Sequence, residues 1–271
     1  MKKSILVVID GQNDFMDVPG AALPVTGAAQ DMNRVALMID QMGHQLWDIQ
    51  LTFDSHHAYH IAHPLFWVNG QGQSPAPFTE ITLQQVNSGQ WRARMPNHQK
   101  LATEYVRALD ANARYNLVIW NPHCLIGSWG HNLYQPLFEA VSDWEKRHVA
   151  IASKVTKGSN WSTEHYSAVR ADVERPDDPG TQLNIGFIET LQEADHIFLT
   201  GQASSHCVAN TVTDIADNFG TEPLNKLFLV EDGMSPVPGF EALSQNFFRD
   251  MKARGVNICS TQEVMSTLKA A

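Results

Sequence analysis

A cysteine at the start of a predicted helix is the strongest candidate nucleophile in this sequence. Cys207 follows the glycine-containing turn 201–206 and precedes a segment with helical spacing. The free N–H groups and the dipole at a helix N-terminus lower the pKa of a thiol, and the same N–H groups can bind a developing oxyanion. Cys124 and Cys259 are interpreted as structural residues, which is the more common role of a single cysteine.

A thiol nucleophile needs a base and a charge partner. No histidine stands in the sequence context of a papain-type base, so an aspartate and a lysine are the better candidates. Asp10 ends the first apolar run of the chain, and Lys154 and Lys157 follow the fourth. We select Asp10 and Lys157, because Lys157 lies deeper in the loop where the site is expected. A lysine taken alone is more often a solvated surface charge.

The segment that begins at Asp54 holds four of the 12 histidines of the chain. Imidazole and carboxylate groups are ligands of ions such as Zn²⁺ or Fe²⁺, and Asp54 and His56 can aim at one point where a strand ends. His123, after the third apolar run, is the third candidate ligand. The alternative interpretation is a polar loop with incidental histidines. Among the remaining histidines of the segment, His60 stays open as a ligand, and His57 and His63 are interpreted as incidental.

Six short apolar runs have the length of β-strands, and they alternate with segments of helical spacing. The runs are residues 5–9, 49–53, 117–120, 149–152, 197–199 and 227–230; the helical segments are 32–42, 137–146, 187–194, 208–218 and 242–254. Continuous apolar runs are typical of strands that are buried on both faces. The sequence therefore predicts an α/β fold with a doubly wound, mostly parallel sheet and helices on both faces.

The polar candidates follow the predicted strands. Asp10 ends the first run, Asp54 the second and His123 the third, and Cys207 comes after the fifth. In a doubly wound sheet, ligands bind at the carboxyl ends of the strands. We therefore expect these side chains to meet at one edge of the sheet and to form one site.

The length of 271 residues and the formal net charge of −10 limit the class of protein. We expect one domain over residues 1–271, with an inserted excursion at about 68–97 that is either a lid or a surface loop. The negative charge argues against nucleic acid or an anionic membrane as a partner. Three distant cysteines and a short N-terminal apolar run predict a cytoplasmic protein.

The candidate residues lie in motifs that resemble those of the isochorismatase-like cysteine hydrolases, and most closely the nicotinamidases. The motifs are residues 10–15 (DGQNDF), 54–56 (DSH), 120–124 (WNPHC), 157–158 (KG) and 201–208 (GQASSHCV). The resemblance spans most of the chain. The Asp-x-His and Pro-His-Cys motifs resemble the metal site that distinguishes nicotinamidases from many sister amidohydrolases.

The resemblance implies a role for each residue. Asp10 would take the thiol proton, Lys157 would hold the charged pair together, and Cys207 would attack an amide carbonyl. The N–H groups of Ala203 and Cys207 would form the oxyanion hole, next to a cis peptide between Gln202 and Ala203. Substrate binding would involve Phe15, packed on the substrate ring, and Gln202; for a second ring-stacking aromatic, Phe66, Trp67 and Trp91 stay open.

The sequence thus predicts a hydrolase that converts a small amide, nicotinamide first, to the acid and ammonia. One divalent ion would orient the substrate ring, with Zn²⁺ expected and Fe²⁺ or Mn²⁺ as alternatives. A small amide is the only partner predicted, apart from a homo-oligomer as an open option. The first alternative is an amidohydrolase of another amide or ureido compound. The second is a non-catalytic metal-binding or thiol redox protein, which leaves Asp10 and Lys157 unexplained.

Overall fold

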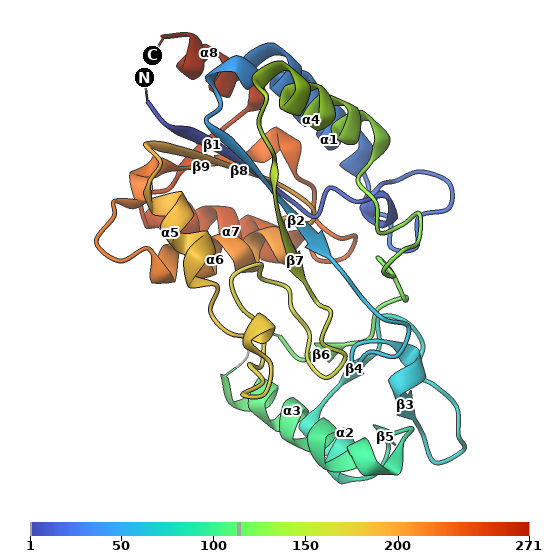
Figure 1. Ribbon diagram of the computed structural model, residues 1–271. Coiled ribbons are helices and arrows are strands. Elements are labelled where there is room, and N and C mark those ends of the chain that lie inside the picture. Colours follow the sequence, from blue (N-terminus) through green and yellow to red (C-terminus); the bar gives the residue numbers. More distant parts are fainter. Residues whose placement is uncertain (1, 113–114, 271) are drawn as a thin grey trace.

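Strand β1 (Ser4–Ile9) lies at the centre of the structure, and all of its residues are buried. In the computed structural model, which describes residues 2–112 and 115–270, β1 is one of six parallel strands that form the main sheet (Figure 1). The other strands are β2 (Asp48–Asp54), β7 (Ser153–Lys157), β8 (His196–Gly201), β9 (Leu227–Val230) and β10 (Asn257–Cys259). Their parallel pairing confirms the predicted fold class.

The order of the strands is β10-β9-β8-β1-β2-β7. From β1 the chain moves outward through β2 to one edge, and later returns to place β8 on the other side of β1. The order in which successive strands are added to the sheet therefore reverses between β1 and β8, although the strands themselves are parallel. A crevice forms at such a reversal, outside the carboxyl ends of the strands, and ligands commonly bind there.

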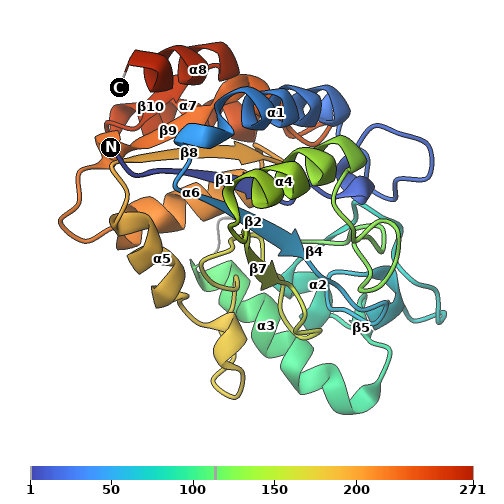
Figure 2. The same ribbon diagram turned by 45° about the horizontal axis from the view of Figure 1, so that its top comes forward.

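Helices cover both faces of the sheet (Figures 1 and 2). On one face lie α1 (Ala28–Met42), α4 (Gln135–His148) and α8 (Thr261–Ala270), and on the other lie α5 (Ile185–Gln192), α6 (Cys207–Asn218) and α7 (Glu241–Ala253). Helix α1 contacts both α4 and α8, and α6 contacts α7. Among the described residues, no helix combines the length and the apolar character that a membrane span requires.

The predicted strand 149–152 is wrong. Val149 follows α4 in a left-handed conformation, and Val149 and Ile151 are 94% and 80% exposed. The strand is β7, which begins at Ser153 and pairs only with β2 at the edge of the sheet. An edge strand has polar residues on its accessible side, so β7 lacks the apolar run on which the prediction relied.

The predicted third strand, 117–120, is also placed differently. Only β6 (Leu117–Val118) is extended, and it pairs with β4 (Glu80–Ile81) in a separate antiparallel sheet. The excursion 68–97 contributes β4, α2 (Leu83–Asn87) and β5 (Arg92–Ala93), which pairs with β3 (Trp67–Val68). Helix α2 packs on α3 (Gln99–Asn112) at one end of the molecule (Figure 1). The pattern of apolar residues predicted neither α3, α8 nor β10.

Gly201 ends β8 at the point where the sheet reverses, and no larger residue fits there. Its φ of +122° is rare for residues with a side chain, and a β-carbon would lie 2.0 Å from the carbonyl oxygen of Ile9. Ile9 is its partner in β1, so the obstacle is the backbone of the central strand.

We predict that Gly201→Ala lowers the free energy of unfolding by at least about 3 kcal/mol, because the two central strands must separate. Gly239→Ala is the matched control: Gly239 has a φ of +89°, but no atom lies within 4 Å of its β-carbon position. That variant should lose only about 1 kcal/mol from its backbone conformation. Urea unfolding measures both, and equal losses would contradict the steric argument.

Candidate active site

Three side chains from the ends of different elements meet at the reversal point of the sheet. Asp10 follows β1, Lys157 ends β7, and Cys207 is the first residue of α6. Lys157 Nζ lies 2.9 Å from Asp10 Oδ2 and 3.5 Å from Cys207 Sγ. The sequence prediction of these residues as neighbours is confirmed, and all three are buried.

The backbone and Thr52 hold Asp10 in place. Asp10 has a φ of +49°, a left-handed conformation that aspartate tolerates better than most residues. Its N–H donates to the carbonyl oxygen of Thr52 in the neighbouring strand β2, and the Thr52 hydroxyl donates to Asp10 Oδ1 at 2.5 Å. One carboxylate oxygen is thus held by Thr52, and the other faces Lys157. Thr52 lies in an apolar run, and nothing in its sequence context indicates a role in the site.

Charges around Lys157 determine the protonation of the site. Burial alone would lower the pKa of Lys157, but Asp10 and Asp54 raise it well above its usual value. Burial raises the pKa of Asp10, against the opposing effect of Lys157. Burial also raises the pKa of Cys207 well above its usual value, although Lys157 opposes this shift. The resting site therefore holds a neutral thiol beside an ammonium group, whereas the helix position alone predicts a lowered thiol pKa.

Asp54 connects this group to the histidine cluster. Its Oδ1 accepts a hydrogen bond from Lys157 at 3.0 Å, while its Oδ2 lies 2.9 Å from His56 Nε2 and 3.0 Å from His123 Nε2. Burial would raise the pKa of Asp54, but His56, Lys157 and the hydrogen bonds from the imidazoles lower it well below its usual value. The predicted set of Asp54, His56 and His123 is therefore brought together, with ligand atoms within 4.8 Å of one another.

The chemistry of these donors fits a divalent cation. His123 Nδ1 lies 2.7 Å from the carbonyl oxygen of Asn121, so in the neutral ring this nitrogen carries the proton and Nε2 presents its lone pair toward Asp54; Nε2 can donate to Asp54 only when the ring is protonated. Histidine ligands of metals typically have this second hydrogen bond. A lone pair facing a carboxylate oxygen is unfavourable unless a cation or a proton lies between them. His56 Nδ1 is buried and has no hydrogen-bond partner among the described residues.

His60 and His63 lie beside His56 and are fully buried. The ring centroids of His60 and His63 are 4.5 and 5.2 Å from that of His56. Burial and the charges of neighbouring histidines lower the pKa of His63 to about 3, so this ring is neutral. The interpretation of His63 as an incidental residue of a polar loop did not anticipate this buried position. His57, in contrast, is exposed.

A cavity adjoins the thiol. Its walls include Phe15, Trp120, Tyr166, Ala203 and Cys207. Phe15, which was expected to contact a substrate ring, is one of these wall residues. Of the aromatic residues that the sequence left open as a second ring contact, Phe66 and Trp67 are buried elsewhere, and Trp91 does not line the cavity. Trp120 and Tyr166, to which the sequence assigned no such contact, line the cavity instead.

Glu164 is another wall residue without a signal in the sequence. It is buried, and its Oε1 lies 3.9 Å from His56 Nε2. Together with Tyr166, Glu164 also lines a larger neighbouring cavity of about 460 Å³. The two cavities therefore share a wall, and residues 68–97 line neither of them.

The turn before Cys207 contains the expected cis peptide between Gln202 and Ala203. Ala203 and Cys207 both line the cavity, and the first N–H groups of α6 have no acceptor within their helix. The Gln202 side chain is oriented differently from the expectation. It donates to Asp31 Oδ2 at 3.0 Å and accepts from Ser235 N–H, and it does not line the cavity. This hydrogen bonding gives the side chain a role in fixing the turn rather than in contacting a substrate.

Comparison with known proteins finds distant relatives of this chain. No family model matches the sequence. The nicotinamidase of Saccharomyces cerevisiae is 22% identical over 253 residues, which cover 93% of this chain and 97% of that protein.

Solved structures share the fold at similarly low identity. The yeast nicotinamidase bound to the inhibitor nicotinaldehyde has a TM-score of 0.66 and 18% identity, with 95% of this chain and 99% of that chain covered. A nicotinamidase/pyrazinamidase from Acinetobacter baumanii has a TM-score of 0.65 and 20% identity, with 97% and 99% covered. The pyrazinamidase of Pyrococcus horikoshii in complex with zinc has a TM-score of 0.55 and 19% identity, with 95% and 99% covered. These matches confirm the resemblance of this chain to the nicotinamidases of the isochorismatase-like family.

Proposed function

We propose that this protein is a cysteine amidohydrolase that converts nicotinamide to nicotinate and ammonia. The observation that carries the proposal is that one buried lysine contacts a carboxylate, a thiol and the aspartate of a metal-ligand set. A nucleophile, a base and a group that can orient a ring nitrogen thus lie in one site. The names of the proteins that this chain resembles support the same substrate.

The first step is attack by the thiol. Cys207 Sγ bonds to the amide carbonyl carbon while its proton passes to the Asp10 carboxylate. The raised pKa of Asp10 makes it a stronger base than an ordinary aspartate. Lys157 stays protonated, because its contacts with Asp10 and Asp54 favour the ammonium form. Its positive charge, 3.5 Å from the sulfur, stabilises the negative charge that develops there.

The next steps release ammonia and then the acid. The carbonyl oxygen becomes an oxyanion, which the N–H groups of Ala203 and Cys207 bind. Asp10 returns its proton to the amide nitrogen, the carbon–nitrogen bond breaks, and ammonia leaves a thioester on Cys207. Asp10 then takes a proton from water, the hydroxide adds to the thioester, and the carbon–sulfur bond breaks. The thiol regains its proton, and the carboxylic acid leaves.

The metal-ligand set would orient the substrate. Asp54, His56 and His123 would hold one divalent ion, Zn²⁺ first, with Fe²⁺ or Mn²⁺ as alternatives; His60 would remain outside this set. When bound, the ion supplies a Lewis acid for the ring nitrogen of the substrate. Phe15, Trp120 and Tyr166 offer apolar walls on which the ring can pack. These contacts would hold the amide carbon against the sulfur.

We predict that Cys207→Ala and Asp10→Asn each reduce kcat at least about a thousandfold while the chain stays folded, because the two residues act as one unit. The double variant should be hardly slower than either single variant. Ammonia release measures the rates, and circular dichroism checks the fold. A Cys207→Ala enzyme that keeps more than about a hundredth of its rate would exclude the thiol mechanism.

The Thr52 hydroxyl should set the acid limb of the pH profile. Its hydrogen bond lowers the pKa of Asp10, so Thr52→Val should raise that pKa. Because the base must be ionised, the fall in kcat/KM on acidification should begin about one pH unit higher than in the wild type. Thr156→Val, at an exposed position beside Lys157, is the control and should leave the limb in place. An unchanged profile in Thr52→Val would remove Asp10 as the base.

Benzamide separates orientation by the metal from other uses of the metal. It has the same amide as nicotinamide but no ring nitrogen, so it should be a poor substrate of the metal-loaded enzyme. On removal of the metal, turnover of nicotinamide should fall by at least about tenfold, whereas that of benzamide should change little. Equal losses for both amides would contradict the orienting role. Turnover of a linear ureido compound in place of both amides would contradict the proposed substrate.

A further inference from the structure

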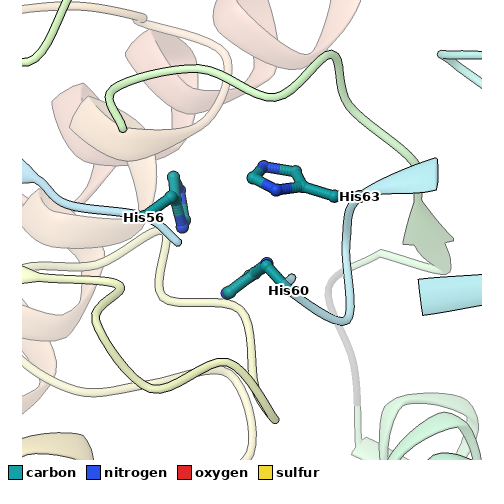
Figure 3. A group of neighbouring side chains, drawn as sticks. All are labelled: His56, His60 and His63. Atoms are coloured by element: carbon teal, nitrogen blue, oxygen red, sulfur yellow. The ribbon is translucent and has the colours of Figure 1, made fainter. Parts of the chain in front are cut away.

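Three buried histidines surround one point beside the proposed active site (Figure 3). His56, His60 and His63 each offer a ring nitrogen, and these nitrogens lie within 4.8 Å of one another. We propose that these histidines form a second metal site, able to hold a divalent ion through imidazole nitrogens alone. It is distinct from the set of Asp54, His56 and His123, with which it shares His56.

The unpaired nitrogens of these rings are the main support for the site. His63 has no exposed surface, and neither of its ring nitrogens makes a hydrogen bond of normal geometry with the described residues, although the backbone of Ala58 lies near the ring. Nδ1 of His56 also has no hydrogen-bond partner among the described residues. A buried polar atom without a partner costs about 1–3 kcal/mol, so such atoms in a native protein usually face a ligand or an ordered water. Here several of them belong to one cluster.

Two backbone groups fix the orientation of His60. The N–H of Ala62 donates to its Nδ1 at 3.2 Å, and Nε2 lies 3.1 Å from the carbonyl oxygen of Thr163. Nε2 therefore donates its proton to a backbone carbonyl, which fixes the ring and its tautomer, as in many histidines that bind a metal. The lone pair of Nδ1 accepts the N–H of Ala62, so an ion bound at Nδ1 would replace this 3.2 Å hydrogen bond.

The composition of the site predicts which ion it prefers. An all-imidazole set suits Zn²⁺, Co²⁺, Ni²⁺ and Cu²⁺, whereas Mn²⁺ and Mg²⁺ prefer oxygen ligands. Because His56 belongs to both sets, one ion per chain can use either position without a further change. Two ions at once would require His56 to bind through both nitrogens and to release its remaining proton to solvent. We therefore consider one ion per chain, which the three histidines hold without Asp54 or His123.

The test removes a ligand that only the first set uses. His123→Asn weakens that set and leaves the three histidines, Asp54 and Lys157 in place. This chain, freed of metal, is titrated with Co²⁺, whose visible absorption reports nitrogen coordination, and elemental analysis counts the bound ion. His63→Phe and His60→Gln are then added separately to His123→Asn. His57→Phe is the matched control, since His57 lies in the same segment but is exposed.

We expect His123→Asn to bind one Co²⁺ per chain, and the His57→Phe control to bind it equally well. Adding His63→Phe or His60→Gln should weaken Co²⁺ binding by at least about tenfold. Mn²⁺ should compete poorly. Absence of Co²⁺ binding in His123→Asn, or binding that does not depend on His63 and His60, would overturn the proposal and leave a buried water as the partner of these rings.

Folding is checked separately, because His63 is buried. Circular dichroism and thermal unfolding are recorded for each metal-free variant, and His63→Gln replaces His63→Phe if the latter does not fold. The readout is metal binding rather than turnover. A negative result would therefore leave the proposed amide hydrolysis untouched, and loss of hydrolysis in His123→Asn would say nothing about the three-histidine site.

Discussion

The other side chains of the site are arranged around two buried ion pairs, which the ammonium group of Lys157 forms with Asp10 and Asp54. Its Nζ lies 2.9 and 3.0 Å from the two carboxylates. A buried charge is tolerated only when it is paired, and removal of one partner typically costs about 3–5 kcal/mol. The sheet provides this pairing directly. Strands β1, β2 and β7 are adjacent and parallel, and Lys157 is the register partner of Asp54.

Asp54 gives this interaction a second consequence. One of its oxygens faces Lys157, and the other faces His56 and His123. The carboxylate therefore links the proposed nucleophile and the proposed metal site through a single side chain. A change in the charge of His56 or His123 should therefore alter the pKa of Lys157 through Asp54, and the pKa of Cys207 through Lys157. Asp54, Lys157, His123 and Cys207 accordingly line one cavity, which brings a thiol and an imidazole into the same wall.

The sequence allowed the prediction of those features that follow from long apolar runs and from the ends of strands. Asp10 and Asp54 end β1 and β2, and Cys207 begins α6, so the fold class and the meeting of these residues could be anticipated. Strand β7 could not, because an edge strand alternates polar and apolar residues and its start is hidden behind the exposed Val149 and Ile151.

Other features of the site depend on contacts between distant parts of the chain. Thr52 matters only because β2 lies beside β1, and Glu164 only because its loop returns to His56. His63 looks like a loop residue in the sequence, yet it is fully buried. Tertiary packing, rather than local spacing, determines the role of each of these residues.

Mass spectrometry of the enzyme, acid-quenched within the first turnover of nicotinamide, can detect the thioester on which the proposed mechanism depends. We expect a nicotinoyl group in thioester linkage on the peptide that contains Cys207, formed together with the first equivalent of ammonia. An acyl group on Cys124, on Cys259 or on any other residue would contradict it. So would release of a first equivalent of ammonia ahead of nicotinate while Cys207 remains unmodified.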